Sequence, residues 1–375
     1  MKKFKVCVIT SAHPALNIRP FYKEAISLVK EGYDVIMIAQ HNKNEVVDGV
    51  KIIALTKPKN RFYRMFVTTL NVFRLALKQK ANVYHFHDPE LIPIGLLLKY
   101  FTKAKVIYDV HEDFPQDILS KYWIPKILRN PISILFNCFE KLAFRKIDYI
   151  FAATPFIKNN FKHYNVINIG NYPIINDFDS QIVLNQNRIN NKSEYIVIYM
   201  GHLTRARGIK EIIQALGFIN VKYKVRLRLL GDFSDRIFEN EVKNLKEWEM
   251  VDYFGWVPQE KIPGHLKEVN TGLACLWPTP NYLNSMPIKT FEYMLCSLPV
   301  VMSNFPHWQE LFKDCALFVN PLNPEEIAKA IEYFIEHPEE AKKMGKNGRR
   351  AVLEKYNWEN EGKKMLKIYG KLLDK

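Results

Sequence analysis

Short apolar runs rich in Val, Ile and Tyr alternate along this chain with longer stretches of helical periodicity, and this alternation restricts the fold more than any other feature. The first half contains KVCVIT, DVIMIA, VKIIAL, NVYHFH, KVIYDV, DYIFAAT and VINIG; the second contains YIVIYMG, KVRLRLLG, MVDYFGWV, TGLACLW, LPVVMS and CALFV. Such a pattern is typical of parallel sheets covered by helices. We therefore predict an α/β fold with two doubly wound, Rossmann-like domains facing a central cleft, with ligands bound beyond the carboxyl ends of the strands.

The chain length and one polar stretch set the domain boundaries. The 375 residues suggest two domains, since a domain averages roughly 150 residues. Residues 172–194 are polar, Asn-rich and without periodicity, which is typical of an interdomain linker. The prediction is an N-terminal domain at 1–171, a linker at 172–194 and a C-terminal domain at 195–356. A final helix at 357–375 can pack on either domain, and packing against the N-terminal domain is one of these two possibilities.

Positive charge is concentrated in the first half. The formal net charge is +15, and residues 1–171 contain 26 Lys and Arg against 13 Asp and Glu, whereas the remainder contains 28 against 26. This asymmetry indicates an anionic partner for the first half, which is a membrane surface, nucleic acid or an anionic substrate.

The cysteines and apolar runs exclude other classes. Five widely separated cysteines without C-x-x-C spacing indicate neither a disulfide framework nor a zinc site, as expected for a reducing cytoplasm. The longest uncharged apolar runs are far shorter than the ~20 residues that cross a bilayer. A dinucleotide oxidoreductase is disfavoured, because no G-x-G-x-x-G follows the first strand of either half.

The segment MGHLTRARGIKEIIQAL predicts a strand, a Gly-bounded loop and a helix. The loop carries Arg205 and Arg207 beside a helix N-terminus, a combination that suits a phosphate group. From the loop alone, a solvated basic surface is an equally good interpretation.

The segment NSMPIKTFEYML places Glu292 in an otherwise apolar helix. The helix is predicted to begin near Met286 or Pro287, with Ser285 as its cap. Glu292 then lies two turns in, where its carboxylate can accept two hydrogen bonds from a ribose diol. The alternative is a surface glutamate, but the apolar neighbours favour burial, and buried carboxylates usually have a partner.

A third segment, VDYFGWVPQEKI, places Trp256 and Val257 after a strand. Together they can offer a wall and free backbone groups to the edge of a base. A turn whose Trp packs in the core is at least as good an interpretation.

These three segments, in this order and spacing, resemble the C-terminal domain of family 4 of the retaining, GT-B-fold glycosyltransferases. YHFHDPELIPIGLLLK and VIYDVHEDFP resemble N-domain segments of bacterial members that build surface polysaccharides. The resemblance implies a nucleotide-sugar donor, with a UDP-sugar favoured, held by the C-terminal domain and a glycan acceptor held by the N-terminal domain. It also implies that no metal or other cofactor is needed, and no acidic pair of the D-x-D kind is positioned like those of metal-dependent transferases.

In the family's glutamate, seven residues, glutamate motif, the second position matches Glu292, which the resemblance places at the donor ribose. The first position is Asn284, an uncharged amide in place of a carboxylate. The backbone of the following segment meets the sugar and diphosphate in relatives. That segment comprises Ser285, Met286, Pro287 and Ile288.

The family pattern G-R-L-x-x-x-K-G reads GHLTRARG here, beginning at Gly201. His202 replaces the arginine and Arg207 replaces the lysine, so Arg207 retains a positive charge for the leaving diphosphate. Arg205 is our candidate for the missing second charge.

Polar side chains also follow the strands of the first half. His111 matches the family's N-domain cleft histidine, which approaches the donor sugar, although a lone histidine is more often structural. With Arg207 and Glu292 it completes the predicted catalytic set. The acceptor-side candidates are His13, Arg19, Asp88, Glu90 and Glu112. Helix capping is the alternative for Asp88 and Glu90.

Two basic, aromatic segments, 61–80 and 121–146, combine large apolar residues with Lys and Arg. Each alone fits an ordinary domain helix. Together with the charge they favour a peripheral contact with an anionic membrane that carries a lipid-linked acceptor.

The leading functional prediction is a retaining hexosyltransferase that builds a cell-surface glycan, located in the cytoplasm on the inner face of the membrane. The alternatives are a nucleotide-sugar 2-epimerase of the same fold and a basic nucleic-acid binder. The last is disfavoured because no recognised motif is present, and no nucleic-acid partner is predicted.

Overall fold

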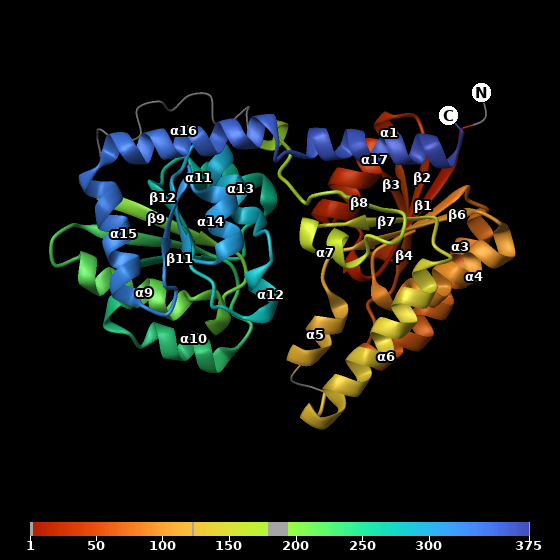
Figure 1. Cartoon of the computed structure of the whole chain (residues 1–375), viewed down its shortest axis with the longest axis horizontal. Coiled ribbons are helices and arrows are strands. Elements are labelled where there is room, and N and C mark those ends of the chain that lie inside the picture. The colour runs from red at the N-terminus through yellow and green to blue at the C-terminus, as the bar shows by residue number, and fades with distance from the viewer. Residues whose placement is uncertain (1–2, 122–123, 179–193, 375) are drawn as a thin grey trace. The chain divides into compact units, whose positions relative to one another are not determined.

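A computed structural model describes residues 3–121, 124–178 and 194–374. The chain divides into two compact units (Figure 1). Unit 1 comprises Met1–Asn171 and Trp358–Lys375, and unit 2 comprises Tyr172–Asn357. Each unit has its own sheet and its own hydrophobic core.

The sheet of unit 1 has the strand order β3-β4-β2-β1-β5-β6-β7-β8. Its strands are β1 Lys5–Pro14, β2 Asp34–Gln40, β3 Glu45–Val47, β4 Val50–Leu55, β5 Val83–Phe86, β6 Lys105–Val110, β7 Tyr149–Ala152 and β8 Val166–Asn168. All pairings are parallel except that of β3 with β4. The chain moves outward from β1 to β4 and then returns to β5, so the order reverses between β1 and β5.

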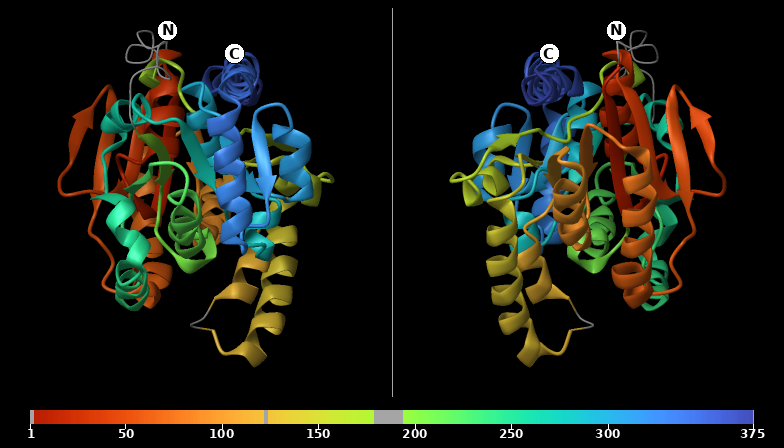
Figure 2. Two further views of the ribbon diagram at one scale, coloured as in Figure 1. Left: turned by 90° about the vertical axis from the view of Figure 1, so that its left-hand side faces the viewer. Right: turned by 90° about the vertical axis from the view of Figure 1, so that its right-hand side faces the viewer.

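Helices cover this sheet. They are η1 Ile18–Ala25, α1 Ile26–Lys30, α2 Arg61–Tyr63, η2 Arg64–Thr68, α3 Thr69–Gln79, η3 Pro89–Leu91, α4 Ile92–Thr102, α5 Phe114–Ser120, α6 Lys126–Phe144, α7 Pro155–Asn160 and α17 Trp358–Leu372. Helix α4 packs against both α3 and α6. In Figure 2, α6 (yellow) extends past the ends of the strands of its unit.

The last helix, α17, is part of unit 1. Trp358 Nε1 donates a hydrogen bond to Ser27 Oγ at 3.0 Å, and Glu361 accepts one from the Gly170 N–H at 2.9 Å. With this helix included, unit 1 contains 31 Lys and Arg against 16 Asp and Glu, and unit 2 contains 23 against 23. The whole formal charge of +15 therefore belongs to unit 1.

The sheet of unit 2 is entirely parallel, with the order β11-β10-β9-β12-β13-β14. Its strands are β9 Tyr195–Met200, β10 Val225–Leu230, β11 Val251–Gly255, β12 Thr271–Ala274, β13 Val300–Ser303 and β14 Ala316–Val319. This is the doubly wound order 3-2-1-4-5-6, which reverses between β9 and β12.

The helices of unit 2 follow from apolar periodicity and capping residues. They are η4 Arg205–Arg207, α9 Ile209–Ile219, α10 Arg236–Lys243, η5 Lys246–Met250, η6 Gln259–Lys261, α11 Ile262–Leu266, α12 Pro280–Leu283, α13 Ile288–Leu295, α14 Pro306–Phe312, α15 Pro324–Glu336 and α16 Pro338–Glu354. Helix α9 buries Ile209, Ile212, Ile213 and Leu216, which lie on one face of the helix. Asn323 caps α15, with Pro324 as its first helical residue.

The predicted α/β class is confirmed, since every apolar run quoted above forms a strand. The predicted linker 172–194 needs correction. Tyr172 and Phe178 are buried in the core of unit 2, so the chain before 179 is packed, while 179–193 lie outside the described residues. Within 3–121, 124–178 and 194–374, every helix is too short or too polar to cross a bilayer.

Candidate functional site

In unit 2, candidate residues gather where the strand order reverses. The loop after β9, the loop after β11 and the segment after β12 all leave the carboxyl end of the sheet. Ligands of doubly wound sheets bind at this position.

Two glycines fix the loop after β9. Gly201 has φ +122°, and Gly208 has φ +69°. A Cβ on Gly208 would lie 1.9 Å from the carbonyl oxygen of Cys275, which follows β12. The Trp277 N–H also donates a hydrogen bond to the Ala206 carbonyl at 2.9 Å. The loop is therefore held closely against the end of β12, in a conformation that favours glycine at both positions.

Two cations meet at Gly201. A Cβ on this glycine would lie 3.2 Å from Nη1 of Arg207 and 3.4 Å from Nζ of Lys289. Arg207 comes from η4, and Lys289 comes from the first turn of α13. The arrangement combines two positive side chains with a backbone that a ligand can approach closely, which suits a phosphate or diphosphate.

Lys289 has an electrostatically unfavourable environment. It is buried, and Nζ has no hydrogen-bond acceptor among the described residues. Nζ lies 3.6 Å from the centroid of the Tyr199 ring, which partly compensates its charge. Burial and the neighbouring Arg207 nevertheless hold the pKa of Lys289 well below its usual range. A bound anion would relieve this unfavourable energy.

Arg205, which was predicted to provide the second positive charge of this site, does not lie beside Gly201. Arg205 forms an ion pair with Glu241 of α10 and lies over the Phe238 ring, 4.8 Å from its centroid. The three-residue turn η4 points its two arginines in different directions, and His202 is exposed. Lys289, which the sequence reasoning overlooked, provides the charge beside Arg207.

Glu292 is buried, as predicted from its apolar neighbours, with 9% of its surface exposed. Its Oε1 accepts a hydrogen bond from Gln259 Nε2 at 3.0 Å, and Gln259 follows β11. Helix α13 begins at Ile288 rather than near Met286 or Pro287. The predicted Ser285 cap is wrong, because its Oγ donates to the Tyr282 carbonyl and leaves the helix start uncapped.

The remaining residues of the segment before α13 are half-buried. Asn284 ends α12, Met286 packs against the core, and Pro287 immediately precedes α13. The Ser285 carbonyl accepts a hydrogen bond from Trp308 Nε1 at 2.7 Å, which fixes the turn.

The loop after β11 separates its two predicted residues. Trp256 is 69% exposed, so the core-packed alternative is wrong for this side chain. Its N–H donates to Asp232 Oδ1 at 3.1 Å. Val257 packs against the core, which leaves the Trp256 ring available to stack on a ligand.

Unit 1 has a second cluster where its strand order reverses. Arg19 of η1 is buried and binds both carboxylate oxygens of Asp109, through Nε at 2.7 Å and Nη2 at 2.8 Å. Its Nη1 donates to the Ile169 carbonyl at 3.0 Å. Arg19 is therefore committed to internal contacts, and its prediction as an acceptor-side residue is wrong.

His111 and His13 keep access to solvent in this cluster. Their side chains are 29% and 46% exposed, and the ring centroids lie 6.4 Å apart. His111 Nε2 lies 3.1 Å from His87 Nδ1 and 3.4 Å from Asp109 Oδ2. Glu112 is also exposed.

Asp88 and Glu90 are occupied by internal hydrogen bonds. Asp88 Oδ2 accepts from Ser11 N at 2.6 Å and from Thr10 Oγ1 at 2.8 Å. Burial alone would raise the pKa of Asp88, but His13 and these hydrogen bonds hold it below its usual value. Glu90 pairs with Arg64 at 2.7 Å. Neither carboxylate acts as a helix cap, and both stabilise the end of β1 rather than offering a free group to an acceptor.

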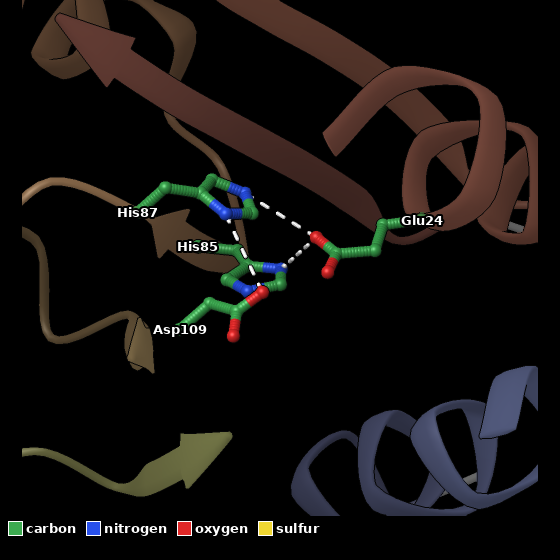
Figure 3. Close-up of side chains that lie close together, drawn as sticks. All are labelled: Glu24, His85, His87 and Asp109. Atoms are coloured by element: carbon green, nitrogen blue, oxygen red, sulfur yellow. Dashed lines mark ion pairs between the residues drawn. The ribbon is translucent and has the colours of Figure 1, made fainter. Parts of the chain in front are cut away.

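Glu24, His85, His87 and Asp109 lie close together below this surface (Figure 3). All four are buried, and one ligand atom from each lies within 4.8 Å of the others. Two imidazoles and two carboxylates are suitable donors for a transition metal. Arg19 Nε, however, lies 2.7 Å from Asp109 Oδ2 and 3.1 Å from Glu24 Oε1, so a guanidinium already provides the positive charge. This donor set therefore fits a metal poorly.

The two halves of the chain match two family models. Residues 22–169 match Glycosyltransferase Family 4, and residues 182–351 match Glycosyl transferases group 1. An alpha-1,3/1,6-mannosyltransferase of Rhizomucor pusillus is 23% identical over 411 residues, which cover 92% of this chain and 87% of that protein.

Two solved structures share the fold of the whole chain. A sucrose-phosphate synthase from Thermosynechococcus elongatus superposes with a TM-score of 0.78 at 17% identity, over 99% of this chain and 100% of that one. An Anabaena protein in complex with UDP-glucose has a TM-score of 0.71 at 14% identity, over 98% and 99%.

Proposed function

Because the chain belongs to the GT-B glycosyltransferases, with a family 4 N-terminal half and a group 1 C-terminal half, we propose that it is a retaining, metal-independent hexosyltransferase. Its donor is a UDP-sugar, held by unit 2. Its acceptor is a lipid-linked glycan of the cell surface, held by unit 1.

The observation that carries this proposal is the pair of cations at Gly201. Arg207 and Lys289 converge on an open backbone, and Glu292 lies one turn after Lys289 on the same helix. A diphosphate between the cations would leave the attached ribose within reach of Glu292, whose carboxylate accepts hydrogen bonds only. Trp256, exposed after β11, would form the wall of the base site.

The chemistry follows from these charges. In the proposed reaction, the bond between the sugar C1 and the phosphate oxygen breaks, and the diphosphate leaves with the electron pair. Arg207 and Lys289 stabilise the charge that develops on it. The acceptor hydroxyl attacks C1 from the same face, its proton passes to the departing phosphate oxygen, and no enzyme nucleophile is involved. His111 of unit 1 contacts the transferred sugar.

A thermal-shift screen with UDP, GDP, ADP, dTDP and their sugars tests the donor. We expect UDP and its hexose conjugates to stabilise the protein by about 2.7 kcal/mol at a hundred times Kd. Glu292→Ala should weaken UDP binding at least about tenfold, because hydrogen bonds to a charged group contribute about 1.5–3 kcal/mol.

The matched control is Glu310→Ala, which removes an exposed glutamate from α14 of the same unit and should leave the shift unchanged. A shift with GDP alone would exclude the UDP donor and favour a GDP-sugar. Conversion of the donor to an isomer without acceptor would favour the epimerase, although the family matches and the named relative are transferases.

The surface of α6 supports the proposed membrane contact of unit 1. Large apolar side chains on this helix are exposed, including Ile127 at 84%, Leu135 at 70% and Ile134 at 63%. Its basic residues are Lys126, Arg129 and Lys141. An exposed helix with this composition, on the unit that carries the whole positive charge, fits the headgroup layer of an anionic bilayer.

Flotation with phospholipid vesicles tests this contact. We expect binding to vesicles that contain an anionic phospholipid, weaker binding at high salt, and little binding to neutral vesicles. Leu135→Asp should weaken binding about tenfold or more, since burial of a leucine contributes about 1.5–3 kcal/mol. The control Val221→Asp changes a side chain of unit 2 that is 88% exposed and should have no effect. Equal recovery with both kinds of vesicle would contradict the proposal.

A further inference from the structure

A line of buried polar groups connects His111 to the interior of unit 1. His111 Nε2 lies 3.1 Å from His87 Nδ1. On its other side, His87 Nε2 lies 3.3 Å from Glu24 Oε2. Glu24 is fully buried, and neither of its oxygens accepts a well-formed hydrogen bond from the described residues. Figure 3 shows the ion pairs that join His87 to the carboxylates of Glu24 and Asp109.

We propose that Glu24 is a positioning residue that acts through His87 to fix the ring tautomer of His111, so that His111 presents Nδ1–H to solvent as a hydrogen-bond donor. The use of this donor on a sugar hydroxyl rests on the proposed function, but the tautomer does not. The position of each proton follows from the groups next to each nitrogen, starting at the buried Glu24 and ending at His111.

Glu24, at the buried end of the line, donates its first hydrogen bond. An ionised carboxylate without hydrogen bonds is very unfavourable in a fully buried site, whereas a protonated acid is tolerated and can donate. Burial and the nearby Asp109 carboxylate raise the pKa of Glu24 well above its usual range, in agreement with the neutral form. Asp109 is a second acceptor near Glu24, but both of its oxygens already accept from Arg19. In the proposal the Glu24 O–H therefore donates to His87 Nε2, and Oε1 faces Arg19 Nε at 3.1 Å.

The position of the proton on His87 determines the position of the proton on His111. With Nε2 accepting from Glu24, a neutral His87 carries its proton on Nδ1. That nitrogen lies 3.4 Å from Asp109 Oδ2, which Arg19 keeps as an acceptor, and 3.1 Å from His111 Nε2. His111 Nε2 also lies 3.4 Å from Asp109 Oδ2, but the contact with His87 is the shorter one, so in this arrangement Nε2 accepts from His87 and the proton of His111 resides on Nδ1. Burial lowers the pKa of His87, which keeps the ring neutral.

The other ionisable groups around the line come from five elements or the segments that follow them. They are His13 of β1, Arg19 and Lys23 of η1, His85 and Asp88 of β5 and its loop, Asp109 and Glu112 of β6 and its loop, and Tyr369 of α17. The Tyr369 hydroxyl lies 2.8 Å from His85 Nδ1, so α17 closes the inner end of the cluster.

The test is the 15N spectrum of the protein labelled at its ten histidines, with His111 assigned from His111→Gln. The protonated and bare nitrogens of a neutral imidazole differ widely in 15N shift, so the tautomer is read directly and without a donor sugar. We expect Nδ1–H at His111 in the wild type. Glu24→Gln should preserve it, because Arg19 binds the amide oxygen and directs the NH2 group to His87.

Glu24→Met removes the donor, and we expect His111 to shift toward the Nε2–H form. Once a donor is known, Glu24→Met should lower kcat up to about a hundredfold with a nearly unchanged donor KM, and Glu24→Gln should restore the rate. The matched control is Glu45→Met in the His41–Glu45 pair, 2.6 Å apart, because Glu45 belongs to the edge strand β3. It should leave the His111 signals unchanged.

Three results would overturn the inference. The first is an Nε2–H tautomer of His111 in the wild type. The second is a His111 spectrum that is the same in the wild type and in Glu24→Met. The third is one zinc ion per chain in the purified protein that is lost in His85→Gln, because a metal would then hold these nitrogens. If Glu24→Met does not fold, the wild type and Glu24→Gln still decide the tautomer.

Discussion

Replacement of Arg207 by Gln is expected to lower kcat about 10²–10³-fold, the usual effect of removing one group that stabilises a developing oxyanion. In the proposed reaction, negative charge grows on the departing diphosphate. Arg207 is one of two cations that converge on the open backbone at Gly201. Gln keeps a hydrogen-bond donor but removes the charge. Initial rates with the donor identified by the screen measure the effect, and KM should change less than kcat.

Arg205→Gln is the matched control, because it makes the same change two residues earlier in the same turn. Arg205 is paired with Glu241 and lies over the Phe238 ring, away from Gly201. We expect its kcat to stay close to that of the wild type. A loss at Arg205 equal to that at Arg207 would contradict the assignment of the phosphate site to Arg207 and Lys289.

The fold could be predicted from the sequence because both sheets are buried on two faces. Strands such as β9 and β12 then become continuous apolar runs, which stand out between amphipathic helices such as α9. The strand that was missed, β3, is three residues long and lies at the edge, where no buried face imposes an apolar pattern. The linker prediction failed before 179 because Tyr172 and Phe178 pack without any local periodicity.

The candidate site was predicted less completely, and α13 shows why. A charge in an apolar helix drew attention to Glu292, yet Lys289 in the same helix is also buried and provided the same signal. The choice of Arg205 over Lys289 relied on sequence proximity. Lys289 reaches Arg207 because β9 and β12 are adjacent in the sheet, so the segments that follow them meet, which only the tertiary structure reveals.

The same limit applies to unit 1. Arg19, Asp88 and Glu90 have the residue types of a polar binding site, and each follows a strand or lies close to one. The partners of Arg19 and Asp88, however, lie 90 and 77 positions away in sequence, in the Arg19–Asp109 and Ser11–Asp88 contacts. Glu24 was overlooked because its helix has an ordinary amphipathic pattern, and its burial against His85 and His87 depends on the pairing of β1 with β5.

Replacement of Lys289 by Met is expected to weaken UDP binding about 10–100-fold while it stabilises the free protein. Hydrogen bonds to charged groups contribute about 1.5–3 kcal/mol, which the bound diphosphate would lose. In the free protein, Lys289 is a buried amine without a hydrogen-bond acceptor among the described residues, and burial and the neighbouring Arg207 make its charged form unfavourable. An apolar side chain of similar length removes that unfavourable energy. Chemical denaturation and calorimetric titration with UDP measure the two opposite effects.

The direction in which stability and UDP affinity change with pH tests the assignment of Lys289. The pKa of Lys289 lies well below its unfolded value of about 10.4, so between the two values the unfolded chain holds a proton that the folded chain lacks. Stability of the wild type therefore rises with pH across this window, and its deficit relative to Lys289→Met narrows.

UDP binding requires the charged amine, so affinity should fall as pH rises through the folded pKa of Lys289, and binding should take up a proton. Titrations in buffers of different ionisation enthalpy measure that uptake. It should vanish in Lys289→Met and persist in the control Lys210→Met, which changes a surface lysine paired with Glu241. The same proton uptake in Lys289→Met as in the wild type would show that another group carries the proton, and the assignment of Lys289 to the diphosphate would fail.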